Sequence, residues 1–151
     1  MQDSEIRNLI EDILRSMTVA YESIEIDIDP ITQNKIFIIK TSDSGLLIGE
    51  GGENYNAFTH LVKRISEKKL KEGQEFFIDI NDYRKNLADK LKIKAKMLAE
   101  RAKDMRSDVE LEPMSSYERL IIHGTLSDYP NIKTESMGEG KSRRVIIKYV
   151  E

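Results

Sequence analysis

The sequence predicts an α+β protein made of two small units, and three observations lead to this class. Along the chain, the spacing of apolar residues changes between the period of a helix and the two-residue period of a strand. A glycine-rich loop lies between a predicted strand and a predicted helix. The two halves of the 151-residue chain differ in pattern and share no repeat. We place the boundary between residues 81 and 82, which gives units of 1–81 and 82–151.

The first unit is predicted to have the order helix, strand, strand, short helix, helix, strand. Apolar residues at helical spacing predict a helix over 3–16, and alternation over 19–28 predicts a strand. An isoleucine-rich run over 35–41 predicts a second strand, which the glycine loop follows. A helix over 53–70 and a strand over 74–80 complete the unit. In the helix over 53–70, the residues that we expect to face the core are Phe58, Leu61, Val62 and Ile65.

The second unit is predicted to begin with a long, lysine-rich helix over 82–106. Its expected core-facing residues are Leu87, Leu91, Ala95, Leu98, Ala102 and Met105. Ser115 and Glu118 have the spacing of a capping box and open a helix that ends near Ser127. The remaining predicted elements are strands over 109–111, 132–136 and 143–149, with a hairpin loop over 137–142.

Composition limits the classes of protein to which the chain can belong. Hydrophobic residues make up 39% and charged residues 34%, and the mean hydropathy is −0.49, which is typical of a soluble protein. Cysteine is absent, so disulfides and thiolate metal sites are excluded. No apolar run approaches the ~20 residues of a membrane helix, and the acidic N-terminus lacks the apolar core of a signal peptide. We therefore expect a cytoplasmic protein without membrane insertion.

The distribution of charge is more informative than the net charge of −3. Residues 1–30 contain eight acidic and two basic side chains, whereas residues 84–106 contain nine basic and three acidic ones. Such asymmetry can create a basic surface on an acidic protein. The charge run alone is also compatible with an ordinary solvated helix face.

The glycine loop is the first candidate site. Gly49, Glu50, Gly51 and Gly52 form an Ile-Gly-x-x-Gly pattern together with Ile48. Glycines allow positive φ and let a backbone lie flat against a ligand, because no Cβ intervenes. This layout is typical of KH modules, which clamp about four nucleotides of a single strand.

The second candidate site is the pair Arg119 and His123, which are four positions apart and share one helix face. A guanidinium offers forked donors and an imidazole offers a donor and a flat ring, so the pair suits a phosphate or a stacked base. The spacing alone also fits a surface arginine beside a structural histidine. Five cations lie on or between the two strands predicted to follow: Lys133, Lys141, Arg143, Arg144 and Lys148.

Catalysis, metal binding and a cofactor are not predicted. Neither His60 nor His123 has a nucleophile–base pairing or metal-ligand spacing around it. The sequence Gly140-Lys141-Ser142 imitates the end of a phosphate-binding P-loop, but position 135 is Glu where that motif has Gly. A strand, and not a helix, is predicted to follow. No catalytic or metal-ligating residue is therefore assigned.

The residues from Glu112 to His123, with the core Arg119-Leu120-Ile121-Ile122-His123, closely resemble an R-3-H domain, named for its Arg-x-x-x-His core. The stretch 134–140 and the Arg143-Arg144-Val145-Ile146-Ile147 run fit that domain too. With the KH-like loop upstream, the chain resembles the bacterial Jag-type proteins over nearly its whole length.

This resemblance implies a KH domain of the αββααβ, type II-like order and an R-3-H domain that bind single-stranded nucleic acid. It also implies a link to cell elongation, division or sporulation, and often a small KH-only partner protein. Two departures are notable. We expect the N-terminal domain found in many members to be absent, and Glu50 stands where Lys or Arg is usual.

The main functional hypothesis is a non-enzymatic protein that binds single-stranded RNA and acts as a regulator. Single-stranded DNA is not distinguished from RNA by any residue pattern, because that choice depends on contacts to the 2′-hydroxyl. The leading alternative is a protein-interaction adaptor that dimerises or docks a partner and has little RNA affinity. A hydrolase of nucleic acid is the third. Because a carboxylate facing phosphate weakens binding, we expect the Arg119/His123 face to contribute more than the Glu50 loop.

Overall fold

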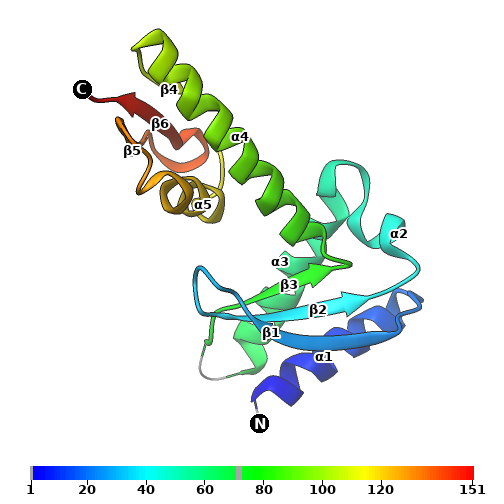
Figure 1. Cartoon of the computed structure of the whole chain (residues 1–151). Helices are drawn as coiled ribbons and strands as arrows, with labels where there is room; N and C mark the ends of the chain where they lie inside the picture. The colour runs from blue at the N-terminus through cyan, green and yellow to red at the C-terminus, as the bar shows by residue number, and fades with distance from the viewer. Residues whose placement is uncertain (1, 71–72) are drawn as a thin grey trace. The chain divides into compact units, whose positions relative to one another are not determined.

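The computed structural model describes residues 2–70 and 73–151, and the chain divides into two compact units, Met1–Arg84 and Lys85–Glu151. Figure 1 shows helices and strands in both units, which confirms the predicted α+β class. Within the described residues, no helix combines the length and the apolar composition needed to span a membrane.

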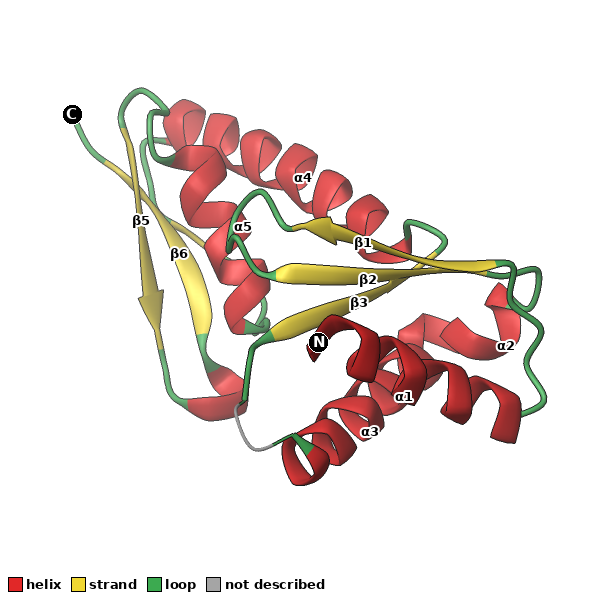
Figure 2. Cartoon of the chain, turned by 90° about the horizontal axis from the view of Figure 1, so that it is seen from below, coloured by secondary structure: helices red, strands yellow, loops and turns green. Residues whose placement is uncertain are grey.

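The first unit has the predicted αββααβ order. Its β1 and β2 are antiparallel, β2 and β3 are parallel, and the sheet order is β1-β2-β3. Helices α1 and α3 lie together on one face of this sheet (Figure 2). The elements are α1 (Gln2–Ser16), β1 (Ser23–Ile28), β2 (Lys35–Lys40), α2 (Ser44–Ile48), a 3-10 turn (Glu50–Gly52), α3 (Glu53–Lys69) and β3 (Phe76–Ile80).

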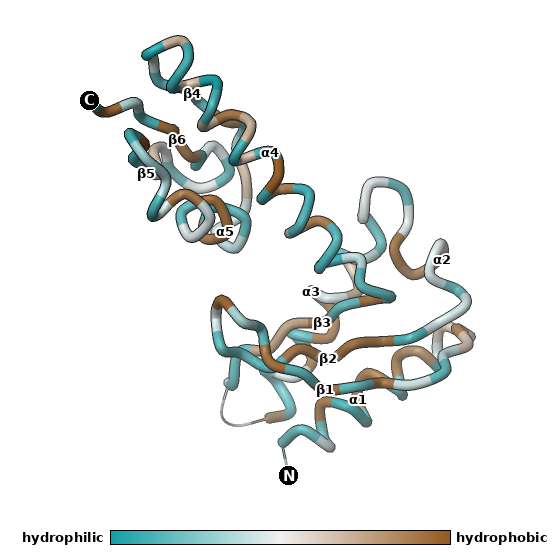
Figure 3. The backbone as a smooth tube through the Cα atoms, in the orientation of Figure 1, coloured by the Kyte–Doolittle hydropathy of each residue, from teal (hydrophilic) through white to brown (hydrophobic). Residues whose placement is uncertain are grey.

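The core of the first unit lies between this sheet face and the helices. Strand β2 is largely hydrophobic (Figure 3), and its Phe37 packs edge-on against Phe76 with ring centroids 5.6 Å apart. On α3, Phe58 and Val62 are buried as predicted, but Leu61 is 47% exposed. Its predicted core position was wrong, because one position along a helix is a rotation of about 100° and carries Leu61 off the buried stripe.

The second unit has a sheet of order β4-β6-β5 in which both strand pairs are antiparallel. The capping box that opens α5 is present: the Ser115 hydroxyl accepts from the Glu118 N–H, and the Glu118 carboxylate accepts from the Ser115 N–H. The elements are α4 (Tyr83–Met105), β4 (Val109–Glu110), α5 (Ser116–Leu126), β5 (Ile132–Met137), a 3-10 turn (Gly140–Ser142) and β6 (Arg144–Tyr149).

Alanines form the buried face of α4. Ala95, Ala99 and Ala102 are fully buried against a core that includes Ile122, Val145 and Ile147, and their small side chains allow close packing. Leu87 and Met105, predicted to face the core, are 46% and 60% exposed. They lie near the two ends of the helix, beyond the positions that this core covers.

Candidate nucleic-acid interface

The glycine loop has a backbone conformation that requires glycine. Gly49, Gly51 and Gly52 have φ of 73°, 61° and 78°, which L-residues with a Cβ rarely adopt. A Cβ on Gly49 would lie 2.7 Å from Cγ of Asn54, whose amide closes the loop by donating to the Leu46 carbonyl at 2.8 Å. The loop is therefore a fixed turn.

The exposed tip of this loop consists of Glu50 and Gly51, whereas Gly52 is buried. A Cβ at Gly51 would meet only open space, but a Cβ at Gly52 would collide with the Tyr83 hydroxyl. Tyr83 in turn packs edge-on against Tyr55, with ring centroids 5.3 Å apart. The tip can present backbone N–H groups to a ligand, but it presents the Glu50 carboxylate beside them.

Three cations converge at a groove of about 660 Å³ near the start of α5. Arg119 donates from Nη1 to the Met114 carbonyl at 2.9 Å, and Arg143 donates from Nη1 to the Gly138 carbonyl at 2.8 Å. Lys141 is exposed in the 3-10 turn between β5 and β6. The residues that line the groove are Pro113, Met114, Ser115, Ser116, Arg119, Gly140, Lys141 and Arg143.

The three cations of this groove are not neutralised by ion pairs within the described part of the chain, although the Glu118 carboxylate lies close by on the Ser115 N–H. Among the described residues, none of the ion pairs involves Arg119, Lys141 or Arg143, and the groove lining contains no acidic side chain. Each arginine is held by a backbone carbonyl through one nitrogen, which leaves its other N–H donors and its full charge. Such an arrangement suits an anion with several acceptor oxygens.

His123 is held between two hydroxyls on β5. Its Nδ1 lies 2.6 Å from Oγ1 of Thr134, and its Nε2 lies 2.8 Å from Oγ of Ser136. Partial burial lowers the pKa of His123, and the positive charges of Arg119 and Arg143 lower it further. The ring is therefore neutral at pH 7, with one nitrogen donating to a hydroxyl and the other accepting from one.

Thr134 and Ser136, whose hydroxyls bond His123, were not predicted as site residues, although their two-residue spacing on a strand was visible in the sequence. Because both ring nitrogens of His123 are already bonded, the histidine fixes β5 against α5 next to Arg119. Its place is that of a positioning residue for the groove.

Lys133 and Arg144 do not join this groove. Side chains alternate along a strand, so Lys133 faces away from the sheet side of Thr134 and Ser136. Arg144 pairs with Met137 on that same outer face, and its Nε bonds the Glu110 carboxylate. Lys148 lies there too and pairs with Glu135 at 2.5 Å. The structure brings Arg119, Lys141 and Arg143 together at the groove and places His123 near the two arginines. Lys133 and Arg144 lie on the opposite face of the sheet.

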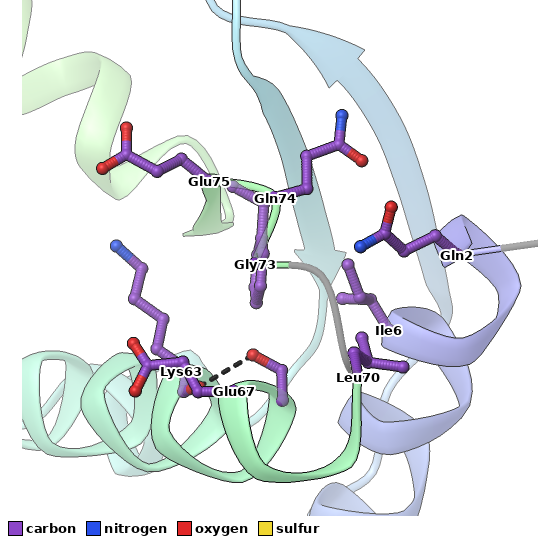
Figure 4. A pocket seen from close by; sticks show the side chains of 10 residues that line it. Gln2, Ile6, Lys63, Glu67, Leu70, Gly73, Gln74 and Glu75 are labelled. Carbon is purple, nitrogen blue, oxygen red and sulfur yellow. Dashed lines mark hydrogen bonds between the residues drawn. The ribbon is translucent and has the colours of Figure 1, made fainter.

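A cavity of about 250 Å³ in the first unit has a different chemistry (Figure 4). It lies between α1, α3 and the start of β3, and apolar side chains such as Ile6 and Leu70 form part of its wall. Burial lowers the pKa of Lys63, while Glu75 and Glu67 act in the opposite direction. With carboxylates beside its lysine, this cavity is a poor site for a polyanion.

The protonation state of His123 leads to a testable prediction about stability. Because its pKa is lowered in the folded protein, the unfolded state binds the proton more tightly. The free energy of unfolding should therefore fall as pH drops below the unfolded pKa of ~6.5, and the loss should level off below the folded pKa. Urea unfolding at pH 7.5 and 5 measures this change, and His123→Gln should show a smaller one. An equal change in both proteins would contradict this assignment.

Two family models match the chain: a KH domain over residues 5–112 and an R-3-H domain over residues 89–149. It is 31% identical over 147 residues to the RNA-binding protein KhpB of Clostridium symbiosum, covering 97% of this chain and 65% of that protein.

Two further relatives carry the same name. The chain is 37% identical over 108 residues to the Bacillus subtilis (strain 168) protein, covering 70% of this chain and 52% of the relative. It is 27% identical over 145 residues to the Lactiplantibacillus plantarum protein, covering 96% of this chain and 45% of the relative. The chain thus spans between 45% and 65% of the length of these three relatives. It belongs to the KH-domain family, and in it an R-3-H domain follows the KH domain, the combination of the Jag-type proteins.

Proposed function

We propose that this protein binds single-stranded RNA through the groove formed by Arg119, Lys141 and Arg143, and that it acts as a regulator and not as an enzyme. The observation that supports this most directly is the convergence of three cations at one groove without a carboxylate in its lining. The relatives named RNA-binding protein KhpB support the same ligand.

The groove holds the phosphate backbone by a defined set of contacts. Arg119 and Arg143 are oriented by their carbonyl partners, so their remaining N–H groups meet two phosphate oxygens with little further loss of side-chain freedom. Lys141 adds a point charge at the rim. These contacts neutralise phosphates and release counterions, which makes the affinity strongly dependent on salt.

The glycine loop contributes a weaker contact. Its exposed tip at Glu50 and Gly51 can approach a sugar–phosphate backbone closely, but the Glu50 carboxylate repels phosphate. We therefore expect the Arg119 groove to contribute more to RNA affinity than the glycine loop does.

A second candidate function is a protein-interaction adaptor, and the acidic loop and the net charge of −3 favour it. In this case the KH domain would dimerise or dock a small KH-only partner. The wider role that we propose, regulation of cell elongation, division or sporulation from the cytoplasm, is compatible with either candidate.

An electrophoretic mobility assay with mixed-sequence single-stranded RNA separates the two candidates. We expect a shifted complex that weakens steeply between 50 and 200 mM salt, and a parallel titration with single-stranded DNA measures the preference between the two nucleic acids. If no complex forms with either nucleic acid at low salt, RNA binding is wrong and the adaptor becomes the leading function.

A further inference from the structure

One face of α4 carries a line of lysines: Lys85, Lys92, Lys96 and Lys103. We propose that this lysine track is a second nucleic-acid contact, separate from the Arg119 groove, that follows the phosphate backbone without reading sequence. The inference rests on the proposed RNA binding and extends it to a surface that neither the glycine loop nor the groove includes.

Helical geometry places these four lysines on one line. Their spacings of seven, four and seven residues keep the side chains within about 40° of each other around the helix axis. At 1.5 Å per residue the track is about 27 Å long. Lys85 and Lys96 are exposed, and Lys92 and Lys103 are half-buried at the edge of the face that Ala95 and Ala99 bury. The track is thus open to solvent along its length.

Most of the charge on the track is unbalanced. Asp89 is the one acidic residue in the sequence between Lys85 and Lys96. In the part of the chain that the structure describes, Lys103 pairs with Glu100 at 3.8 Å, and no ion pair is found for Lys85, Lys92 or Lys96. Like charges four residues apart, such as Lys92 and Lys96, destabilise a helix. A bound polyanion would remove this repulsion, which is a direct energetic reason for phosphate to bind here.

An aromatic ring lies at the C-terminal end of the track. Nζ of Lys103 is 5.5 Å from the ring centroid of Tyr129, and the Tyr129 hydroxyl is bonded to the Glu100 carboxylate, which fixes the ring. Tyr129 remains half-exposed. Cations that follow a backbone, together with an aromatic ring on which a base can stack, are the combination used by proteins that bind single strands without sequence preference.

The C-terminal end of the track and the groove lie at opposite ends of α5. Tyr129 follows the C-terminus of α5, whereas the groove is lined by Ser115 and Ser116 at its N-terminus. An 11-residue helix is about 16 Å long, so one phosphate cannot contact both Tyr129 and the groove. The two surfaces can therefore be tested independently.

The test compares two triple variants of α4 that remove the same charge. Lys85→Gln/Lys92→Gln/Lys96→Gln removes three cations of the track, and Lys90→Gln/Lys94→Gln/Arg101→Gln removes three cations from the other side of the same helix. We expect the first to weaken binding of a mixed-sequence single-stranded RNA on the order of tenfold and to flatten the log-affinity against log-salt slope by about 2. The matched control should change the slope far less.

The outcomes distinguish this inference from the proposed function. Equal losses of RNA affinity in the two triple variants would show a general charge effect and would contradict the proposed role of the lysine track. Wild-type binding by the track variant, with weak binding by Arg119→Ala, would overturn the track and leave the groove in place. If the wild-type protein binds no RNA, both the proposed function and this inference are wrong. Thermal melts check that each variant is folded. The single variant Lys96→Gln, at an exposed position, tests the track with less change to the helix. It should flatten the log-affinity against log-salt slope by ~0.7.

Tyr129 provides a readout that is independent of charge. Tyr129→Leu removes the ring and should weaken binding without changing the salt slope, because base stacking neutralises no phosphate. Tyr129→Phe loses the bond to Glu100 but keeps the ring, and should retain most of the affinity. Equal losses for Leu and Phe would contradict the stacking role.

Discussion

Arg119→Ala is expected to weaken binding of single-stranded RNA by about 10- to 100-fold, with similar losses for all sequences. The arginine contributes a charged hydrogen-bond donor to phosphate, and such bonds contribute about 1.5–3 kcal/mol. Because one phosphate contact is lost, the slope of log affinity against log salt should also flatten by ~0.7. Fluorescence anisotropy at several salt concentrations measures both quantities.

The matched control is Arg144→Ala, which removes the same charge from the opposite face of the sheet. Arg144 is bonded to the Glu110 carboxylate, so its loss should leave RNA affinity and the salt slope near those of the wild type.

His123→Ala should weaken RNA binding with a smaller change of the salt slope, because a neutral imidazole does not neutralise the charge of a phosphate. Melts of Arg119→Ala and Arg144→Ala must stay near wild type, and the melt of His123→Ala measures the effect of losing the two bonds to β5. A normal salt slope for Arg119→Ala would exclude this groove as the binding surface.

The order of helices and strands could be predicted from the sequence because the signals that set it are local. The capping box of Ser115 and Glu118 is a contact between residues three apart, and it marks the start of α5 correctly. The two-residue alternation identified β1 and its last residue, although the strand begins at Ser23 and not at residue 19, and β5 begins at Ile132 as predicted. Such patterns depend on the chain near each element, and not on what packs against it.

The composition of the groove could be predicted only in part. The cations after α5 were visible in the sequence, but which of them share a face depends on strand alternation relative to the core. Ile132 is buried, so Lys133 has to point away from α5. Alternation could have revealed this, whereas the position of Lys141 depends on the 3-10 turn at Gly140–Ser142, which no sequence period predicts.

The exposed leucines show a second limit of prediction from the sequence. Leu61 and Leu87 fit helical patterns, but a pattern gives only a broad apolar stripe, and the partner elements decide how much of it is covered. Alanines at 95, 99 and 102 form the centre of the contact of α4, and Leu91 and Leu98 pack beside them, whereas Leu87 lies beyond this contact and stays in solvent.

Gly52→Ala is expected to lower the free energy of unfolding by about 3 kcal/mol. Its φ of 78° would cost an alanine about 1–2 kcal/mol, and the collision of the new Cβ with the Tyr83 hydroxyl adds an overpacking cost of about 1–3 kcal/mol. Gly51→Ala should cost only the first of these, because a Cβ there meets open space. Urea unfolding of the two variants measures the difference.

A double-mutant cycle isolates the contribution of Tyr83. Tyr83→Ala removes the ring that a Cβ at position 52 would strike, so in that background Gly52→Ala should cost no more than Gly51→Ala does in the wild type. If Gly52→Ala is equally destabilising with and without the Tyr83 ring, the burial of Gly52 against Tyr83 is not what requires glycine there. The comparison also matters for function. Because Gly52 supports the fold and Gly51 lies at the exposed tip, RNA contacts of the loop should be tested with Gly51→Asp, which destabilises the fold less than a change at Gly52.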